Sequence, residues 1–235
     1  MDESRAATAA SFRAWRPPWL LPAALLLILA FLTVNVLGDG PLVGVDHRIR
    51  EAVLARATSA TWRWLTAGRL APARALVHFG DIRVAVPVLA VSAAILAVRR
   101  RSVRPLLAAV AGVALLAATV IPAKIVIARP APGQVLLAPG GWGVFPSGHS
   151  STSAVCLLLA VLMIAPELPA VVRRPAVALA AALCVLVGAA LVWCDDHWCT
   201  DVVAGWAVAA IVVQVALGIA RPPREGSGHT ARARA

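Results

Sequence analysis

Long apolar runs alternate with short polar segments over most of this chain. Several of these runs reach the roughly 17–25 residues that a helix needs to cross a bilayer. We place the predicted spans at residues 19–37, 83–98, 105–127, 149–165, 175–193 and 198–219. The pattern therefore predicts an all-α, polytopic membrane protein in which six transmembrane helices form a bundle.

The polar segments divide the chain into a membrane domain and two tails. We expect an N-terminal tail at residues 1–18, the membrane domain at 19–220 and a basic C-terminal tail at 221–235. The first run is longer than the core of a signal peptide and is followed by no clear cleavage site, so we interpret it as a span. Part of the long connection at 38–80 mixes charged and apolar positions, near residues 47–65, as interfacial helices do.

Composition supports this assignment. The chain is 60% apolar with a mean hydropathy of +0.83, which excludes an ordinary soluble domain. Its net charge of +11 comes from Arg residues in the connecting segments, so it indicates membrane topology and not a nucleic-acid partner. The bilayer itself is the expected partner, and no pattern indicates an oligomeric state.

Arg residues close to the span ends predict the orientation. They occur in both tails and at residues 99–104 and 173–174, and short Arg-bearing segments face the cytoplasm. The segments 38–80, 128–148 and 194–197 then lie outside the cytoplasm. We therefore predict a multi-pass protein of the inner or plasma membrane with cytoplasmic termini.

The four Cys residues are too few for a disulfide scaffold. Cys194 and Cys199 flank a polar turn and could pair if that turn faces an oxidising compartment. The adjacent Asp195 and Asp196 could bind a divalent metal, but such pairs more often lie in a solvated turn that caps a helix. We favour the turn and expect no metal.

A polar turn interrupts the apolar runs at residues 145–151. Ser147, Gly148 and His149 would lie in the first turn of the fourth span, where backbone N–H groups lack partners and the helix dipole is positive. Such a turn suits an anion, above all phosphate. The simpler alternative is a helix cap between two spans.

Two further features lie on the same predicted face. His197 and Asp201 are spaced i, i+4, which places both on one side of a helix, and a carboxylate behind a His raises its basicity. Lys124, the chain's one Lys, lies near the outer end of the third span. The alternatives are a structural His–Asp pair and a Lys that reaches the membrane interface.

Together these motifs resemble the type-2 phosphatidic acid phosphatases, a family of membrane lipid-phosphate phosphatases related to the vanadium haloperoxidases. Pro146-Ser147-Gly148-His149 matches the second family motif, and His197-Trp198-Cys199-Thr200-Asp201, continuing to Gly205, matches the end of the third. Lys124 and Pro132 have the spacing of the first motif. The resemblance extends from the second predicted span to the sixth.

The resemblance implies an extracytoplasmic active site without metal or cofactor. Lys124, Ser147 and Gly148 would hold the phosphate, with Arg129 as a candidate helper. His197 would attack phosphorus to form a phosphohistidine, and Asp201 would orient His197. His149 would protonate the leaving oxygen and later activate water. The substrate would be a lipid phosphate or diphosphate such as undecaprenyl diphosphate, phosphatidate or phosphatidylglycerol phosphate.

Two positions depart from the family pattern. Ala131 and Leu191 stand where the family has Arg residues that grip phosphate. The alternative function is therefore a catalytically impaired member that acts as a lipid-binding or complex-forming membrane protein. A transporter is less favoured, because the polar residues gather at one face and not at the midplane.

Overall fold

The structure is a computed structural model that describes residues 19–58, 70–137 and 140–221. All regular elements in these ranges are helical. They are α2 (Leu20–Leu37), α3 (Pro41–Thr58), α5 (Leu70–Val77), the 3₁₀ turn η1 (His78–Gly80), α6 (Ile82–Arg100), α7 (Arg104–Ile127), α8 (Gly148–Ser153), the π-helical segment η2 (Ala154–Leu158), α9 (Leu159–Ile164), the 3₁₀ turn η3 (Ala165–Glu167), α10 (Ala170–Trp193) and α11 (Cys199–Ala220).

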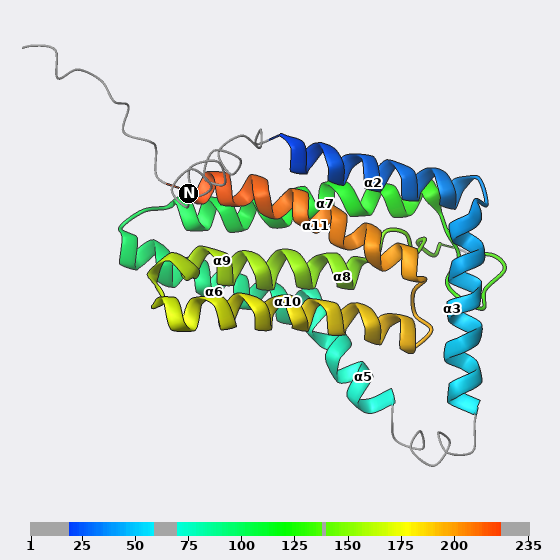
Figure 1. The fold of residues 1–235 in the computed structure, drawn as a ribbon. Helices are drawn as coiled ribbons and strands as arrows, with labels where there is room; N and C mark the ends of the chain where they lie inside the picture. Colours follow the sequence, from blue (N-terminus) through cyan, green and yellow to red (C-terminus); the bar gives the residue numbers. More distant parts are fainter. Residues whose placement is uncertain (1–18, 59–69, 138–139, 222–235) are drawn as a thin grey trace, which may run out of the picture.

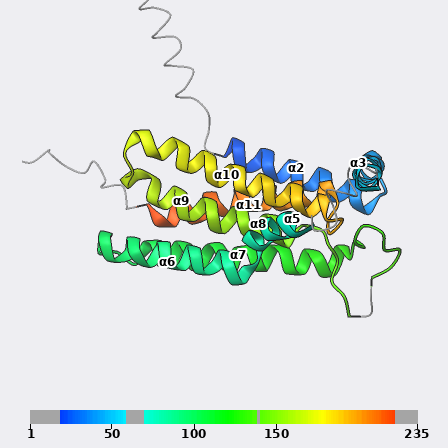
Figure 2. The ribbon, with the colours of Figure 1, turned by 90° about the horizontal axis from the view of Figure 1, so that it is seen from below.

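Six helices in the described ranges are long and apolar enough to cross a membrane. They are α2, α6, α7, α10, α11 and the continuous helix Gly148–Glu167, which contains α8, η2, α9 and η3. Figures 1 and 2 show them running side by side as one bundle. The predicted six-span, all-α membrane fold is thus confirmed. Both tails lie outside the described residues.

The centre of the bundle is formed by α11 and by the helix that contains α8 and α9. In the apolar stretch of α11, 50% of the residues are buried, whereas in that of α2 only 11% of the residues are buried. Small residues explain the close packing, because they let helix backbones approach one another. Gly112 of α7, for example, lies where an added Cβ would come within 3.1 Å of Leu159. The outer helices expose Leu, Ile and Val side chains, as expected for surfaces that face lipid.

One helix crosses the others. Figure 1 shows α3 lying across one end of the bundle. The chain enters it through a sharp turn in which Asp39 has a φ of 47°, a conformation that Asp tolerates better than most residues. An interfacial helix was predicted near residues 47–65. The helix starts earlier, at Pro41, and residues 59–69 lie outside the described ranges.

The same end of the bundle carries most of the polar structure. Helix α5 packs against α10, and η1 packs against α8. The connection from α7 to α8 also lies at this end (Figure 1). Helix α3, α5 and this connection therefore surround the ends of α7, α8 and α11, where the predicted site residues occur.

Candidate functional site

The turn before α8 is fastened to the start of α11. Ser147 is the N-cap of α8, and its Oγ accepts a hydrogen bond from the backbone N of Ser150 at 3.4 Å. The backbone N of Ser147 donates to the carbonyl oxygen of Asp201 at 3.0 Å. Ser147 is fully buried. Its hydroxyl thus acts as a cap, while the N–H groups of Gly148 and His149 lie in the open first turn of the helix.

A glycine makes this close approach possible. A Cβ added to Gly205 of α11 would lie 2.8 Å from the carbonyl oxygen of Ser147 and would also collide with Oγ of Ser150. These separations are shorter than real Cβ contacts. Gly205 therefore sets the distance between the Ser147 turn and α11, a structural role that the sequence motif alone did not reveal.

His197 and Asp201 form the pair predicted from their spacing. Nδ1 of His197 lies 3.4 Å from Oδ2 of Asp201, and that oxygen also accepts from the backbone N of Trp198 at 3.0 Å. Asp201 is fully buried and His197 is 8% exposed. A carboxylate at Nδ1 favours the tautomer that carries its proton there, which leaves the Nε2 lone pair available.

A buried ion cluster lies behind this pair. Nη1 of Arg129 donates to Oδ1 of Asp201 at 2.5 Å and to Oγ1 of Thr200 at 2.7 Å. Nη2 of Arg129 donates to Oδ2 of Asp46 at 2.8 Å. Asp46 also accepts from the backbone N of Thr200 at 3.0 Å. All four side chains are buried.

Arg129 therefore has a different position from the one expected of a phosphate ligand. Its guanidinium lies between two carboxylates, and its Cζ lies 5.2 Å from the centroid of the Trp198 ring. Two buried carboxylates are costly without a counter-charge, and Arg129 supplies it. In this arrangement the Arg129 side chain supports Asp201 from behind.

Lys124 lies beside the Ser147 turn. Its Nζ donates to the carbonyl oxygen of Gly143 at 2.9 Å. A Cβ added to Gly148 would lie 3.6 Å from Cε of Lys124, so the Lys stem contacts the first turn of α8. An ammonium group beside open N–H groups is a favourable arrangement for an anion.

His149 completes the arrangement. Its ring lies within electrostatic range of Lys124, His197, Asp81 and Asp196. The turn η1 packs directly on its backbone, since a Cβ added to Gly80 would lie 2.6 Å from the His149 carbonyl oxygen. The structure thus brings the predicted residues Lys124, Gly148, His149, His197 and Asp201 to one end of the bundle.

The two positions that depart from the family pattern are not equivalent. Leu191 is 1% exposed and packs with Val187 and Val202 in a small apolar cluster. Ala131 is partly exposed in the connection after α7. Neither position therefore supplies a cation, but α5 brings one to the turn before α11: Nη1 of Arg74 lies 3.5 Å from Oδ2 of Asp196.

The adjacent carboxylates Asp195 and Asp196 are ion-pair partners. Asp195 binds Arg50 of α3 through two parallel hydrogen bonds of 2.8 Å, which raise the pKa of the Arg50 guanidinium. No group of three His, Cys, Asp or Glu side chains in the described ranges is arranged to hold a metal ion. Cys194 and Cys199 are free thiols in this structure, and burial raises the pKa of Cys194.

Sequence reasoning missed Asp46 and Thr200. Asp46 lies 154 residues before Thr200, on a helix whose mixed charged and apolar pattern gives no sign that this one carboxylate is buried. Thr200 lies in the third motif, between Cys199 and Asp201. A single Thr in a helix does not by itself indicate a functional role. Only the tertiary contact identifies either residue.

Comparisons with known proteins bear on the family and on the fold of the chain. A family model described as the PAP2 superfamily matches residues 105–223. Among solved structures, the crystal structure of the first transmembrane PAP2 type phosphatidylglycerolphosphate phosphatase from Bacillus subtilis has the same fold, with a TM-score of 0.70 and 21% sequence identity over 84% of this chain and 94% of that one. No curated protein sequence matches the chain.

Proposed function

The chain belongs to the PAP2 superfamily, and we propose that it is a membrane phosphatase that hydrolyses a lipid phosphate or diphosphate through a phosphohistidine. The His197–Asp201 pair carries this proposal. A nearly buried imidazole with a buried carboxylate 3.4 Å from its Nδ1 is prepared for nucleophilic attack through Nε2. It lies at the same end of the bundle as the open first turn of α8.

The reaction has two steps. In the first, Nε2 of His197 attacks phosphorus, the bond from phosphorus to the leaving oxygen breaks, and His149 donates a proton to that oxygen. In the second, His149 takes a proton from water, the water oxygen attacks phosphorus, and the P–N bond breaks. His149 thus acts as general acid and then as general base, and His197 ends the cycle neutral.

Groups around the first turn of α8 bind the phosphate in this scheme. Lys124 supplies a positive charge, and the backbone N–H groups of Gly148 and His149 supply donors at the positive end of the helix dipole. The Ser147 hydroxyl shapes this turn by capping it. No metal is required in this scheme, because these groups and His149 provide the positive charge.

Asp46 and Arg129 set the charge next to the nucleophile His197. Two buried carboxylates, Asp46 and Asp201, share the single guanidinium of Arg129, so the cluster carries a net negative charge. When phosphorylation makes the His197 ring cationic, that net charge stabilises it. If Asp46 were absent, Arg129 would neutralise Asp201 and much of this stabilisation would be lost. We therefore propose that Arg129 positions Asp201 and does not bind the substrate phosphate.

The orientation follows from the Arg distribution. The ends of the spans opposite the site carry Arg99–Arg101 and Arg173–Arg174, which favours a cytoplasmic location for that end and for both termini. The phosphate group of the substrate would then be processed on the outer side, with its lipid tail among the spans. Undecaprenyl diphosphate, phosphatidate and phosphatidylglycerol phosphate all have this chemistry.

Phosphate release by the purified full-length protein tests the proposal. We expect release from at least one of these three lipids in the presence of EDTA. His197→Ala should lower the rate by at least about a thousandfold, whereas His229→Ala, a histidine in the C-terminal tail, should not change it. An acid-labile phosphoenzyme should form with labelled substrate in the parent and should not form in His197→Ala. Equal rates in the parent and His197→Ala would exclude the mechanism.

The alternative is a lipid-binding or complex-forming protein without catalysis. It is favoured by one observation, the apolar packing of Leu191 where the family has an Arg. That alternative would be established if the protein bound these lipids but released no phosphate and formed no phosphoenzyme.

A further inference from the structure

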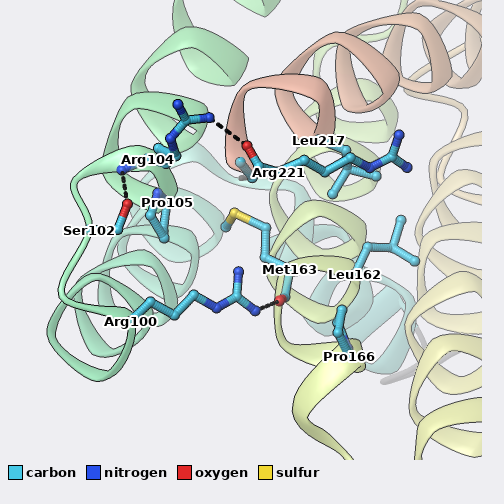
Figure 3. Close-up of a pocket in the computed structure, with 10 residues that line it drawn as sticks. Arg100, Ser102, Arg104, Pro105, Leu162, Met163, Pro166, Leu217 and Arg221 are labelled. Atoms are coloured by element: carbon cyan, nitrogen blue, oxygen red, sulfur yellow. Dashed lines mark hydrogen bonds between the residues drawn. The ribbon is translucent and has the colours of Figure 1, made fainter. Parts of the chain in front are cut away.

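A second polar feature lies at the opposite end of the bundle from His197. A cavity of about 590 Å³ opens between the ends of α6, α7, α9 and α11. Its volume is within the roughly 300–1,000 Å³ of typical ligand sites. Its wall is mainly apolar and includes Leu162, Met163 and Leu217. Figure 3 shows the side chains of Arg100, Arg104 and Arg221 around these residues.

Two of these Arg side chains are held in place by the protein. Nη2 of Arg100 donates to the Met163 carbonyl oxygen at 2.7 Å, and its Nε donates to Glu167 at 2.7 Å. Nη1 of Arg104 donates to the Arg221 carbonyl oxygen at 2.6 Å. A guanidinium has five N–H donors, so both groups keep donors for a further acceptor. Their positions are fixed before any ligand binds, which lowers the entropic cost of binding.

Positive charge at this end is poorly balanced. At this end of the bundle the described part of the chain has seven Arg residues and one acidic residue, Glu167. The seven are Arg99, Arg100, Arg101, Arg104, Arg173, Arg174 and Arg221. Glu167 already forms ion pairs with both Arg99 and Arg100, at 3.5 and 2.7 Å. An anion would therefore be attracted to the rim of the cavity.

We propose that this cavity binds one anionic phospholipid of the surrounding leaflet. The headgroup phosphate would bind Arg100, Arg104 and Arg221, and an acyl chain would lie along Leu162, Met163 and Leu217. A phosphate accepts charge-assisted hydrogen bonds from guanidinium groups, and basic pockets between spanning helices suit such headgroups. The site is separate from His197, so it does not depend on the proposed function.

Lipid retention measured by native mass spectrometry of the full-length protein tests this site. Dioleoylphosphatidylglycerol is the probe, because it is a phosphodiester and carries no phosphomonoester to hydrolyse. We expect the protein to retain it in preference to dioleoylphosphatidylcholine. At about 1 kcal/mol for each Arg, Arg100→Gln with Arg104→Gln should weaken retention roughly thirtyfold.

The chain offers a matched control. Arg99→Gln with Arg101→Gln removes the same charge from the region where α6 ends and α7 begins but replaces no residue of the cavity wall, and it should leave retention nearly unchanged. Arg221→Gln, at an exposed position, provides a second test if the double variant does not fold, and it should weaken retention about fivefold. Excess inorganic phosphate should not displace the lipid.

Several results would overturn the proposal. Equal retention of the two lipids would show that the headgroup charge is not recognised. An equal loss in both double variants would indicate a general effect of positive charge without a specific site. Displacement by inorganic phosphate alone would indicate an anion site that does not require the acyl chain. His197→Ala should retain the lipid as the parent does, which separates this result from any failure of catalysis.

Discussion

Nη2 of Arg129 lies 2.8 Å from Oδ2 of Asp46, although 83 residues separate them in the chain. Asp46 belongs to α3, which lies outside the six spans and outside the region matched by the family model. Because Arg129 also binds Asp201, one guanidinium connects α3 to the carboxylate behind His197. Helix α3 is therefore part of the site and not only a cover for the end of the bundle.

Asp46→Asn should reduce turnover. The substitution removes a charge but keeps the shape, so the charge-assisted bond to Arg129 is lost at a cost of about 1.5–3 kcal/mol. If this cost falls on the transition state, kcat drops about 10- to 100-fold, while KM changes little because Asp46 is not expected to touch substrate. Steady-state phosphate release measures both constants. Glu51→Gln, an exposed acid on the same helix, should behave as the parent.

A double-mutant cycle tests whether Asp46 acts through Arg129. If the two residues work as one unit, Asp46→Asn combined with Arg129→Gln should be little worse than Arg129→Gln alone. The coupling free energy should be about 1–3 kcal/mol in kcat. A phosphate-binding Arg129 would give another result: Arg129→Gln would mainly raise KM, and its effect would add to that of Asp46→Asn.

Gly205→Ala should displace the Ser147 turn. The added Cβ would meet backbone of Ser147 at 2.8 Å as well as Oγ of Ser150, and backbone cannot move away cheaply. We expect a loss of stability of about 1–3 kcal/mol from overpacking and a loss of phosphatase activity. Gly218→Ala is the matched control on α11, since an added Cβ there meets no atom within 4 Å. The midpoint temperature of thermal unfolding and the rate of phosphate release should both fall in Gly205→Ala. Both should stay at the parent's values in Gly218→Ala.

The six spans could be predicted because the length and apolarity of a run decide whether a helix crosses a bilayer. The His197–Asp201 contact could also be predicted from local sequence, although for a different reason than expected: His197 lies in the turn before α11, and Asp201 reaches back to it from the first turn of the helix, where its Oδ2 also accepts from the backbone N of Trp198. Both inferences depend on local sequence alone.

The role of Arg129 could not be predicted in the same way. Its partners are set by the position of α3 across the bundle, which no local pattern encodes. The Ser147 turn shows the same limit: the capping bond from Ser150 to the Ser147 hydroxyl is local and was given as an alternative from the sequence, but the close contact of this turn with α11 depends on Gly205. The sequence motifs supplied the candidate site residues, and the fold shows which of them contact one another.

Cys194 offers a test of the position of α5 through its reactivity. Burial raises the pKa of this thiol above its ordinary value of 9.0, the Asp196 carboxylate raises it further, and the Arg74 guanidinium lowers it. A raised pKa means less thiolate at a given pH, so alkylation of Cys194 should be slow at pH 7, should rise about tenfold for each pH unit, and should level off only above its ordinary value of 9.0. Peptide mass spectrometry after iodoacetamide treatment measures this residue separately from the other thiols.

The two neighbours of Cys194 should then change its alkylation rate in opposite directions. Asp196→Asn removes a negative charge that disfavours the thiolate, so the rate at pH 8.5 should rise. Arg74→Gln removes a positive charge that favours it, so the rate should fall. Partly exposed charges contribute about 0.2–1 kcal/mol, equivalent to about 1.5- to 5-fold in rate, and Arg83→Gln on α6 should change nothing. A shift of the same sign in both variants would show that Arg74 does not reach the turn that carries His197, and α5 would then supply no cation to the site.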